Sequence, residues 1–352
     1  MESPRRFYLI TQPRTASNLL VKILGVENLQ PEVQHGGRAS GYWFMDAASA
    51  RWTPEFTNRS MEEWTDEEKT RIRQGYQKAF DDFEAFLEKA EINNKIVFSK
   101  EHAFVLGNPA TQWREFFAQR SALVDAEWVV KVPEKYAKSP TWSEHNKTIL
   151  PDEFLRTFKP IFLIRHPAIA FPSFYRAALD VQNGLGGSFT SDQKSVLTFW
   201  HIRKLYDWYE ADIAKSGSAP SSSGQTEGHS TLPWPVVIDA DDIIRDPEAM
   251  ANKLCEIVGL DKTKLQFEWE PDTGETVLPG NELFNKAARR MMSTLRASTG
   301  ILKEKLAANI DIDAEAKKWK EEFGEEEGAD IERRVREAIP DYEYLKARKL
   351  QV

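Results

Sequence analysis

The sequence predicts an α/β fold of three layers (αβα), in which helices cover both faces of a central parallel sheet. Two observations predict it. Short runs of apolar, β-prone residues, such as those at 7–10 and 161–164, alternate along the chain with amphipathic segments of helical period. Uninterrupted apolar runs are typical of strands buried on both faces, and strands that are separated by helices pair in parallel. Because 352 residues can bury a large core, we expect one domain over residues 1–352, with extra helices around the sheet.

The first predicted strand is Phe7–Ile10, and it leads into a polar turn at Gln12–Ala16. Apolar residues recur at helical spacing after Ser17 and Asn18, so a helix is expected to begin there. The first N–H groups of a helix have no partner within the helix and carry the positive end of its dipole. This junction of strand, loop and helix therefore predicts an oxyanion site.

A second segment, 161–175, repeats the design, with Arg165 at the end of the strand and Ser173 eight residues later. We expect the two segments to bind one ligand that carries two separate phosphate-like groups. A Walker loop needs a Gly-Lys pair, and a dinucleotide site needs G-x-G-x-x-G, but the chain contains neither pattern. The predicted anion loop is thus built from Pro, Arg and hydroxyl residues, and no metal is expected.

The middle of the chain supplies further elements. Residues 27–60 are expected to be irregular, and Thr65–Glu68 is a capping box that opens a long amphipathic helix. Strands are predicted at Ile96–Ser99 and at Glu127–Lys131, and a short helix at Pro151–Phe158. The apolar stripe of the long helix consists of Ile72, Tyr76, Phe80, Phe83 and Leu87.

The second half of the chain continues the alternation. Ser191–Lys215 is predicted as one long helix with an aromatic face that packs in the core. Residues 216–232 are rich in Ser and Gly and predict a flexible surface insertion. Val236–Leu260 combines a strand, an acidic turn and a helix that ends at a Gly-Leu pair, and residues 280–352 are expected to be helical and acidic.

Composition excludes some classes of partner. The net charge of −8, without a basic tract, argues against nucleic-acid binding. A single cysteine, Cys255, cannot form an internal disulfide. Residues 1–6 do not resemble a signal peptide, and no apolar run approaches the ~20 residues that span a bilayer. These features predict a soluble, cytoplasmic protein without membrane partners, and they leave the oligomeric state open.

Three segments resemble motifs of the PAPS-dependent sulfotransferase family (PAPS, 3′-phosphoadenosine 5′-phosphosulfate). Pro13–Leu20 is similar to the family's 5′-phosphosulfate loop, P-[KR]-[ST]-G-[ST]-[ST]-x-L, with Ala16 at the glycine position. Arg165–Pro167, followed by Ser173, resembles the R-x-P motif and serine that bind the 3′-phosphate. Val236–Leu260 is similar to the family's strand, acidic turn and D-P-x helix. The three segments occur in the family's order and span most of the chain.

The resemblance implies the P-loop-like sulfotransferase fold, PAPS as donor, PAP as the product, and a small molecule with a hydroxyl or phenol group as acceptor. It also implies that Arg165 and Ser173 bind the 3′-phosphate. The cofactor loop would consist of Arg14, Thr15, Ala16, Ser17 and Asn18. The C-terminal R-K-G segment that contacts the 3′-phosphate in cytosolic members of the family is absent, and 295–300 (LRASTG) is only a weak match to it.

The catalytic residues are expected after the strand at 96–98, where the family commonly has K-T-H and this chain has Lys100, Glu101 and His102. The resemblance implies that His102 is the general base and that Lys100 meets the charge on the leaving phosphate. A base whose pKa is about 6.5 suits proton removal at neutral pH. Glu101 is the alternative base, since some branches of the family use Glu, and Lys131 is a competing lysine.

Two other functions stay open at this point. An enzyme with the sulfotransferase fold could perform acid–base chemistry, such as dehydration or cyclisation, with His102 or Glu101 and no sulfuryl transfer. A non-catalytic anion-binding module is the third reading. The 11 Trp residues could line an apolar pocket in each case, and His35 lies in a Gly-rich loop that could border it.

Overall fold

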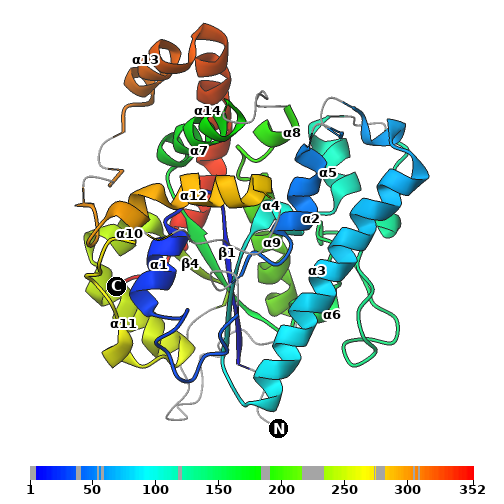
Figure 1. The fold of residues 1–352 in the computed structure, drawn as a ribbon, viewed down its shortest axis with the longest axis horizontal. Helices are drawn as coiled ribbons and strands as arrows, with labels where there is room; N and C mark the ends of the chain where they lie inside the picture. Colours follow the sequence, from blue (N-terminus) through cyan, green and yellow to red (C-terminus); the bar gives the residue numbers. More distant parts are fainter. Residues whose placement is uncertain are drawn as a thin grey trace.

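A four-stranded parallel sheet forms the centre of the protein (Figure 1). Its strand order is β2-β1-β3-β4, and the strands are β1 (Arg6–Thr11), β2 (Val97–His102), β3 (Lys159–Ile164) and β4 (Val236–Asp239). The computed structural model describes residues 5–36, 41–53, 55–56, 59–117, 121–183, 191–215, 234–272, 274, 282–303, 306–307 and 310–352. Within these residues, the α/β fold with a central parallel sheet is confirmed.

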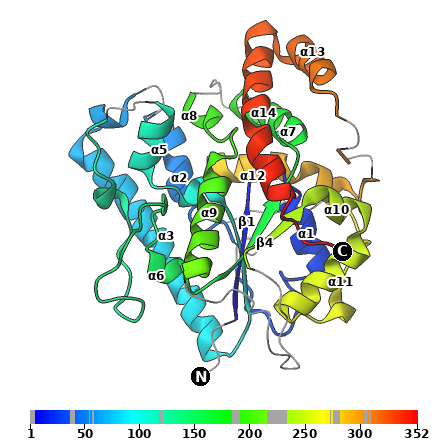
Figure 2. The same ribbon diagram turned by 180° about the vertical axis from the view of Figure 1, so that it is seen from behind.

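Helices cover both faces of the sheet (Figures 1 and 2). The alternation of side chains along β1 shows the two layers, because Tyr8 and Ile10 join one core cluster while Phe7 and Leu9 join the other. The first cluster lies under α3 (Asp66–Ile92), α9 (Trp200–Lys215) and α14 (Glu325–Lys346), and the second lies under α1 (Ser17–Leu24), α10 (Ala240–Arg245) and α11 (Pro247–Val258).

Shorter elements and the C-terminal helices complete the described structure. They are α2 (Met45–Ser49), η1 (Ala50–Trp52), η2 (Met61–Glu63), α4 (Ala103–Leu106), α5 (Pro109–Phe116), η3 (Asp125–Trp128), α6 (Asp152–Leu155), α7 (Pro167–Asn183), α8 (Ser191–Lys194), η4 (Lys262–Lys264), α12 (Glu282–Ala297) and α13 (Ile312–Phe323). In Figure 1, α12 crosses above the ends of the strands, and α13 and the start of α14 form a hairpin at the top.

The long helix α3 begins at the predicted capping box. Thr65 accepts a hydrogen bond from the backbone N–H of Glu68, and the Glu68 carboxylate accepts one from the N–H of Thr65. The predicted apolar stripe is buried over its whole length. The strands predicted at 7–10, 96–99, 161–164 and at the start of 236–260 are also confirmed, and β2 runs on to His102, which pairs with Thr11 in the parallel register.

The strand predicted at Glu127–Lys131 is wrong. The segment begins within the 3-10 helix η3, which ends at Trp128, and Val130 then donates its N–H to the carbonyl of Ile149 (3.1 Å) rather than to a strand. Trp128 and Val130 are buried, so the apolar run reflects packing under a loop. The outer edge of β2 is already paired with other segments, through parallel bridges from Val33 to Ile96 and from Gly41 to Lys100.

Two other predictions need correction. The helix predicted at Ser191–Lys215 is interrupted between α8 and α9, where the side chain of Thr198 accepts a hydrogen bond from the N–H of Trp200 (3.1 Å) and begins the second helix. Residues 27–60 are not wholly irregular, since they contain α2 and η1. The insertion predicted at 216–232 lies outside the described residues.

The turn between β1 and α1 has an unusual backbone. Arg14 has a φ of 68° and Ala16 a φ of 62°, so two residues with a Cβ adopt the left-handed conformation. Each such residue costs roughly 1–2 kcal/mol. Ala16 is also the N-cap of α1 and has no side chain that could bond the free N–H groups. The first N–H groups of α1 therefore have no hydrogen bond from an N-cap side chain and can bind a ligand.

We predict that Ala16→Gly raises the free energy of unfolding by about 0.5–1 kcal/mol, because glycine removes the Cβ strain and this outweighs the greater freedom of the unfolded chain. Urea denaturation followed by circular dichroism measures the change. The matched control is Ala85→Gly, which lies exposed in the interior of α3 and is expected to lose about 1 kcal/mol. A loss of stability at position 16 would contradict the strain inferred from the backbone.

Candidate functional site

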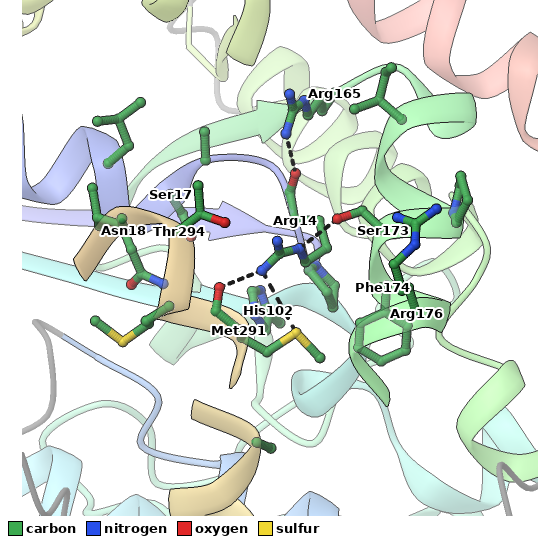
Figure 3. Close-up of a pocket in the computed structure, with 18 of the residues that line it drawn as sticks. Arg14, Ser17, Asn18, His102, Arg165, Ser173, Phe174, Arg176, Met291 and Thr294 are labelled. Carbon is green, nitrogen blue, oxygen red and sulfur yellow. Dashed lines mark hydrogen bonds between the residues drawn. The ribbon is translucent and has the colours of Figure 1, made fainter. Parts of the chain in front are cut away.

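A pocket of about 490 Å³ lies at the carboxyl edge of the sheet (Figure 3). Its wall comes from the turn between β1 and α1, the end of β2, and helices α2, α7, α12 and α13. Open parallel sheets commonly bind their ligands at this edge. Seven of the residues that the sequence singled out line it: Arg14, Ala16, Ser17, Asn18, His102, Arg165 and Ser173.

The two predicted anion segments contact each other in this pocket. Nε of Arg14 donates to Oγ of Ser173 (2.9 Å), and Nη1 of Arg165 donates to the backbone carbonyl of Arg14 (3.1 Å) (Figure 3). Thr15 does not line the pocket, since its buried hydroxyl donates to the carbonyl of Gln12 (2.8 Å) and holds the turn. Segments about 150 residues apart in the sequence thus form one site.

Backbone strain is concentrated at the same place. Among the described residues, four that are not glycine have a positive φ, and three of them, Arg14, Ala16 and Tyr42, line this pocket. Thr15 keeps a negative φ between the two left-handed residues of the turn. Such an alternation turns successive N–H groups toward one point, which makes an anion-binding nest. Strained backbone tends to cluster at functional sites.

The charge of the pocket is positive. The guanidinium groups of Arg14, Arg165 and Arg176 line it, and that of Arg176 is paired with the carboxylate of Glu322 (2.5 and 2.6 Å). In the described part of the chain, no carboxylate lies within ion-pair distance of Arg14. Burial, and after it the charge of Arg165, lowers the pKa of Arg14 to about 10. A buried cation without a counter-ion favours a bound anion.

Lys100 is fully buried beside the loop. Its ammonium group donates to Oδ1 of Asn18 and lies 4.5 Å from the centre of the Tyr42 ring. Burial lowers the pKa of Lys100 to about 8, so the side chain is charged at neutral pH. Lys100 itself does not line the pocket, and its charge reaches the pocket through Asn18, which does.

His102 stands at the end of β2, opposite Thr11. Its Nδ1 lies 2.6 Å from the hydroxyl of Thr11, and that hydroxyl donates its proton to the carbonyl of Glu101 (3.1 Å). We therefore assign the ring proton to Nδ1, which leaves Nε2 as the proton acceptor. Burial, and then the charge of Lys100, lowers the pKa of His102 to about 3, so the ring is neutral at physiological pH.

The Glu101 side chain makes hydrogen bonds outside the pocket. Its carboxylate accepts hydrogen bonds from the N–H of Phe44, which precedes α2, and from the N–H of His102 (3.1 Å each), and the side chain is fully buried without lining the pocket. The other two candidates lie elsewhere too. Lys131 and His35 are exposed, and neither lines the pocket.

Aromatic rings form one wall of the pocket. The ring of His102 lies 5.0 Å from Tyr42 and stacks 5.9 Å from Phe104, which stacks in turn 5.6 Å from Trp52. All four line the pocket. Sequence reasoning singled out neither these three aromatic residues nor Thr11. The signal for Thr11 was available, because the last residue of a parallel strand lies beside the last residue of its neighbour.

Another part of the wall is α12, whose apolar residues Met291, Met292 and Leu295 line the pocket. Arg14 donates through Nη1 to the carbonyl of Met291 and so ties this helix to the loop (Figure 3). In the segment 295–300, Leu295, Ser298 and Gly300 line the pocket, but Arg296 is bonded to Asp272 (3.0 Å) instead.

Glu315, at the α13 end of the pocket, is paired with Lys318 (2.6 Å). No cluster of three or more His, Cys, Asp or Glu side chains that could hold a metal ion occurs among the residues that the structure describes. None of the described helices is both long and apolar enough to cross a membrane.

Comparison with known proteins identifies the family. No family model matches the chain. Two solved structures are similar to it, a sulfotransferase domain of the Synechococcus PCC 7002 olefin synthase (13% identity, 93% of this chain and 97% of that one) and one of the curacin biosynthetic pathway (12%, 92% and 98%). The TM-score is 0.34 for each, so neither superposition establishes the fold by itself.

Two curated fungal proteins match over nearly the whole length. Sulfotransferase ppzF of Metarhizium rileyi is 39% identical over 348 residues, and sulfotransferase ppzF of Metarhizium majus is 40% identical over 350 residues. In each case the match covers 99% of this chain and 97% of the relative. At this identity and coverage, the chain belongs to the sulfotransferase family.

Proposed function

We propose that the protein transfers a sulfuryl group from PAPS to the phenolic hydroxyl of a small apolar molecule. The observation that carries the proposal is the meeting of Arg14, Arg165 and Ser173 in one pocket that also contains His102. A pocket with two anion-binding segments and a neutral histidine fits a donor with two phosphate positions and an acceptor that must lose a proton.

The donor end of the pocket fits PAPS in its chemistry. The 5′-phosphosulfate would bind the N–H groups of the strained turn, next to Ser17 and Asn18, and the 3′-phosphate would bind Arg165 and Ser173. Planar guanidinium groups suit phosphate because they can donate two parallel hydrogen bonds. When bound, PAPS supplies the activated sulfuryl group, and PAP remains. The buried charge of Lys100, which contacts Asn18, would stabilise negative charge that develops on this side.

The acceptor end fits a phenol. His102 would take the acceptor's proton on Nε2, held in the correct orientation by the bond from Nδ1 to Thr11. A histidine whose pKa is lowered to about 3 is a weak base, and a phenol, which ionises near ~10, gives up its proton more easily than an aliphatic alcohol does. The rings of Trp52 and Phe104 offer stacking surface for an aromatic acceptor.

The experiment that tests the donor is a calorimetric titration with PAP. The wild-type protein should bind PAP, and Arg165→Ala should weaken PAP by about 10- to 100-fold, because a charge-assisted bond is lost. The same substitution should weaken adenosine 5′-phosphosulfate much less than PAP, since that ligand lacks the 3′-phosphate. Arg333→Ala, on the exposed face of α14, is the matched control and should alter neither ligand. Equal weakening of both ligands by Arg165→Ala, or no PAP binding at all, would contradict the assignment.

The general base is tested by kinetics with PAPS and a phenol. His102→Ala should lower kcat about 10²- to 10⁴-fold while PAP affinity stays within about twofold, because the ring acts on the acceptor's proton rather than on the donor. The surface histidine His145 provides the control, and His145→Ala should leave kcat unchanged.

Glu101→Gln separates the alternative base from the favoured one. The carboxylate bonds two backbone N–H groups away from the pocket, so this substitution should lower the melting temperature and change kcat less than His102→Ala does. A larger loss of kcat in Glu101→Gln than in His102→Ala would transfer the role of base to the carboxylate.

A further inference from the structure

Tyr42 has a backbone that its residue type does not favour. Its φ is 60°, a left-handed value that is an outlier for a bulky aromatic residue. Its N–H donates to the carbonyl of Lys100 (2.9 Å), and the neighbouring Gly41 makes a parallel bridge to the same residue. A Cβ at Gly41 would lie 1.8 Å from the carbonyl oxygen of Lys100, so only glycine permits this approach. The segment is thus fixed on the edge of β2 at the cost of local strain.

The side chain of Tyr42 contacts both halves of the site. Its ring lies 4.5 Å from the ammonium of Lys100 and 5.0 Å from the ring of His102, and its hydroxyl hydrogen-bonds the side chains of Ser17 and Asn18 in the loop. The residue lines the pocket. Burial raises the pKa of Tyr42 well above its ordinary value, so the phenol stays protonated and does not act as a base.

The ring has a definite effect on Lys100. The ammonium is fully buried and donates a hydrogen bond to Asn18, and the ring face supplies further stabilisation for its charge. A buried ammonium that lost this contact would be less stable in its charged form and less strictly directed at the loop. Strain at a residue persists where the surroundings over-determine it, and at Tyr42 the surroundings are Lys100, His102 and the anion loop.

We propose that Tyr42 is a positioning residue for sulfuryl transfer: its ring directs the Lys100 ammonium toward Asn18, and its hydroxyl fixes the donor loop at Ser17. This role rests on the proposed function, because it assigns Tyr42 to the step in which Lys100 stabilises charge on the donor. Ring and hydroxyl contribute separately. The hydroxyl acts on donor binding and the ring acts on turnover.

The test compares Tyr42→Phe with Tyr42→Leu, by PAP titration and by steady-state kinetics. Tyr42→Phe keeps the ring, so PAP affinity should fall about 2- to 10-fold, through the lost hydroxyl bonds, while kcat is nearly retained. Tyr42→Leu also removes the ring, so its kcat should be about 2- to 30-fold lower than that of Tyr42→Phe because the cation–π contact with Lys100 is lost. Tyr344→Leu is the matched control, since Tyr344 also packs against cations, Arg203 and Arg348, but does not line the pocket. It should leave kcat unchanged.

A double-mutant cycle with Lys100→Met distinguishes positioning from a purely structural role. If Tyr42 acts through Lys100, Tyr42→Leu should change kcat less than about twofold in the Lys100→Met background. Provided that the wild-type protein binds PAP, additive losses of kcat in the cycle, or equal kcat for Tyr42→Phe and Tyr42→Leu, would overturn the role of Tyr42 alone. Wild-type protein that binds no PAP would overturn the proposed function and this role with it.

Discussion

The site depends on the sharp turn by which β1 passes into α1. Two residues with a Cβ, Arg14 and Ala16, adopt left-handed conformations there, and the free N–H groups of α1 then face the carboxyl edge of the sheet. Strain of this size persists only if neighbouring contacts hold it. Those contacts come from Arg165, which donates to the carbonyl of Arg14, and from Ser173, which accepts from its guanidinium. The two anion segments therefore stabilise each other's conformation.

Charge gives the pocket its preference for an anion. Most arginines of the described structure have carboxylate partners, as Arg176 has Glu322 and Arg290 has Asp180. Arg14, by contrast, bonds a hydroxyl and the carbonyl of Met291, neither of which carries charge. Burying a guanidinium without a counter-ion is costly, so a bound anion recovers free energy that the protein alone does not. The same contacts join α7 and α12 to the loop, and they make the shape of the pocket sensitive to what binds Arg14.

Local sequence patterns predicted most of the fold and seven of the residues that line the pocket. Some features could be predicted because each depends on residues that are close in the sequence. These are the strand at 7–10, the capping box at Thr65 and the buried stripe of α3. The same reason made it possible to predict the loop at 14–18 and the segment that contains Arg165 and Ser173. The family assignment is confirmed by the curated relatives, whereas the roles of the site residues and the single-domain organisation stay predictions.

What the sequence did not predict depends on distant contacts. The apolar run at Glu127–Lys131 has the composition of a strand, but the edge of β2 is already paired, so the run packs as a loop. Thr11 and Tyr42 became visible only through the register of β1 against β2 and through a positive φ that no periodicity reveals. Glu101 sits next to His102 in the sequence, yet it bonds the start of α2 and does not line the pocket.

We propose that the strained loop and the second anion segment hold the two phosphate ends of one nucleotide. A crystal structure of the protein with PAP tests this proposal most directly. We predict that the 5′-phosphate accepts hydrogen bonds from the N–H groups between Ala16 and Asn18, and that the 3′-phosphate lies within hydrogen-bonding distance of Arg165 and Ser173. A nucleotide bound elsewhere, or one whose 3′-phosphate points to solvent, would contradict the account.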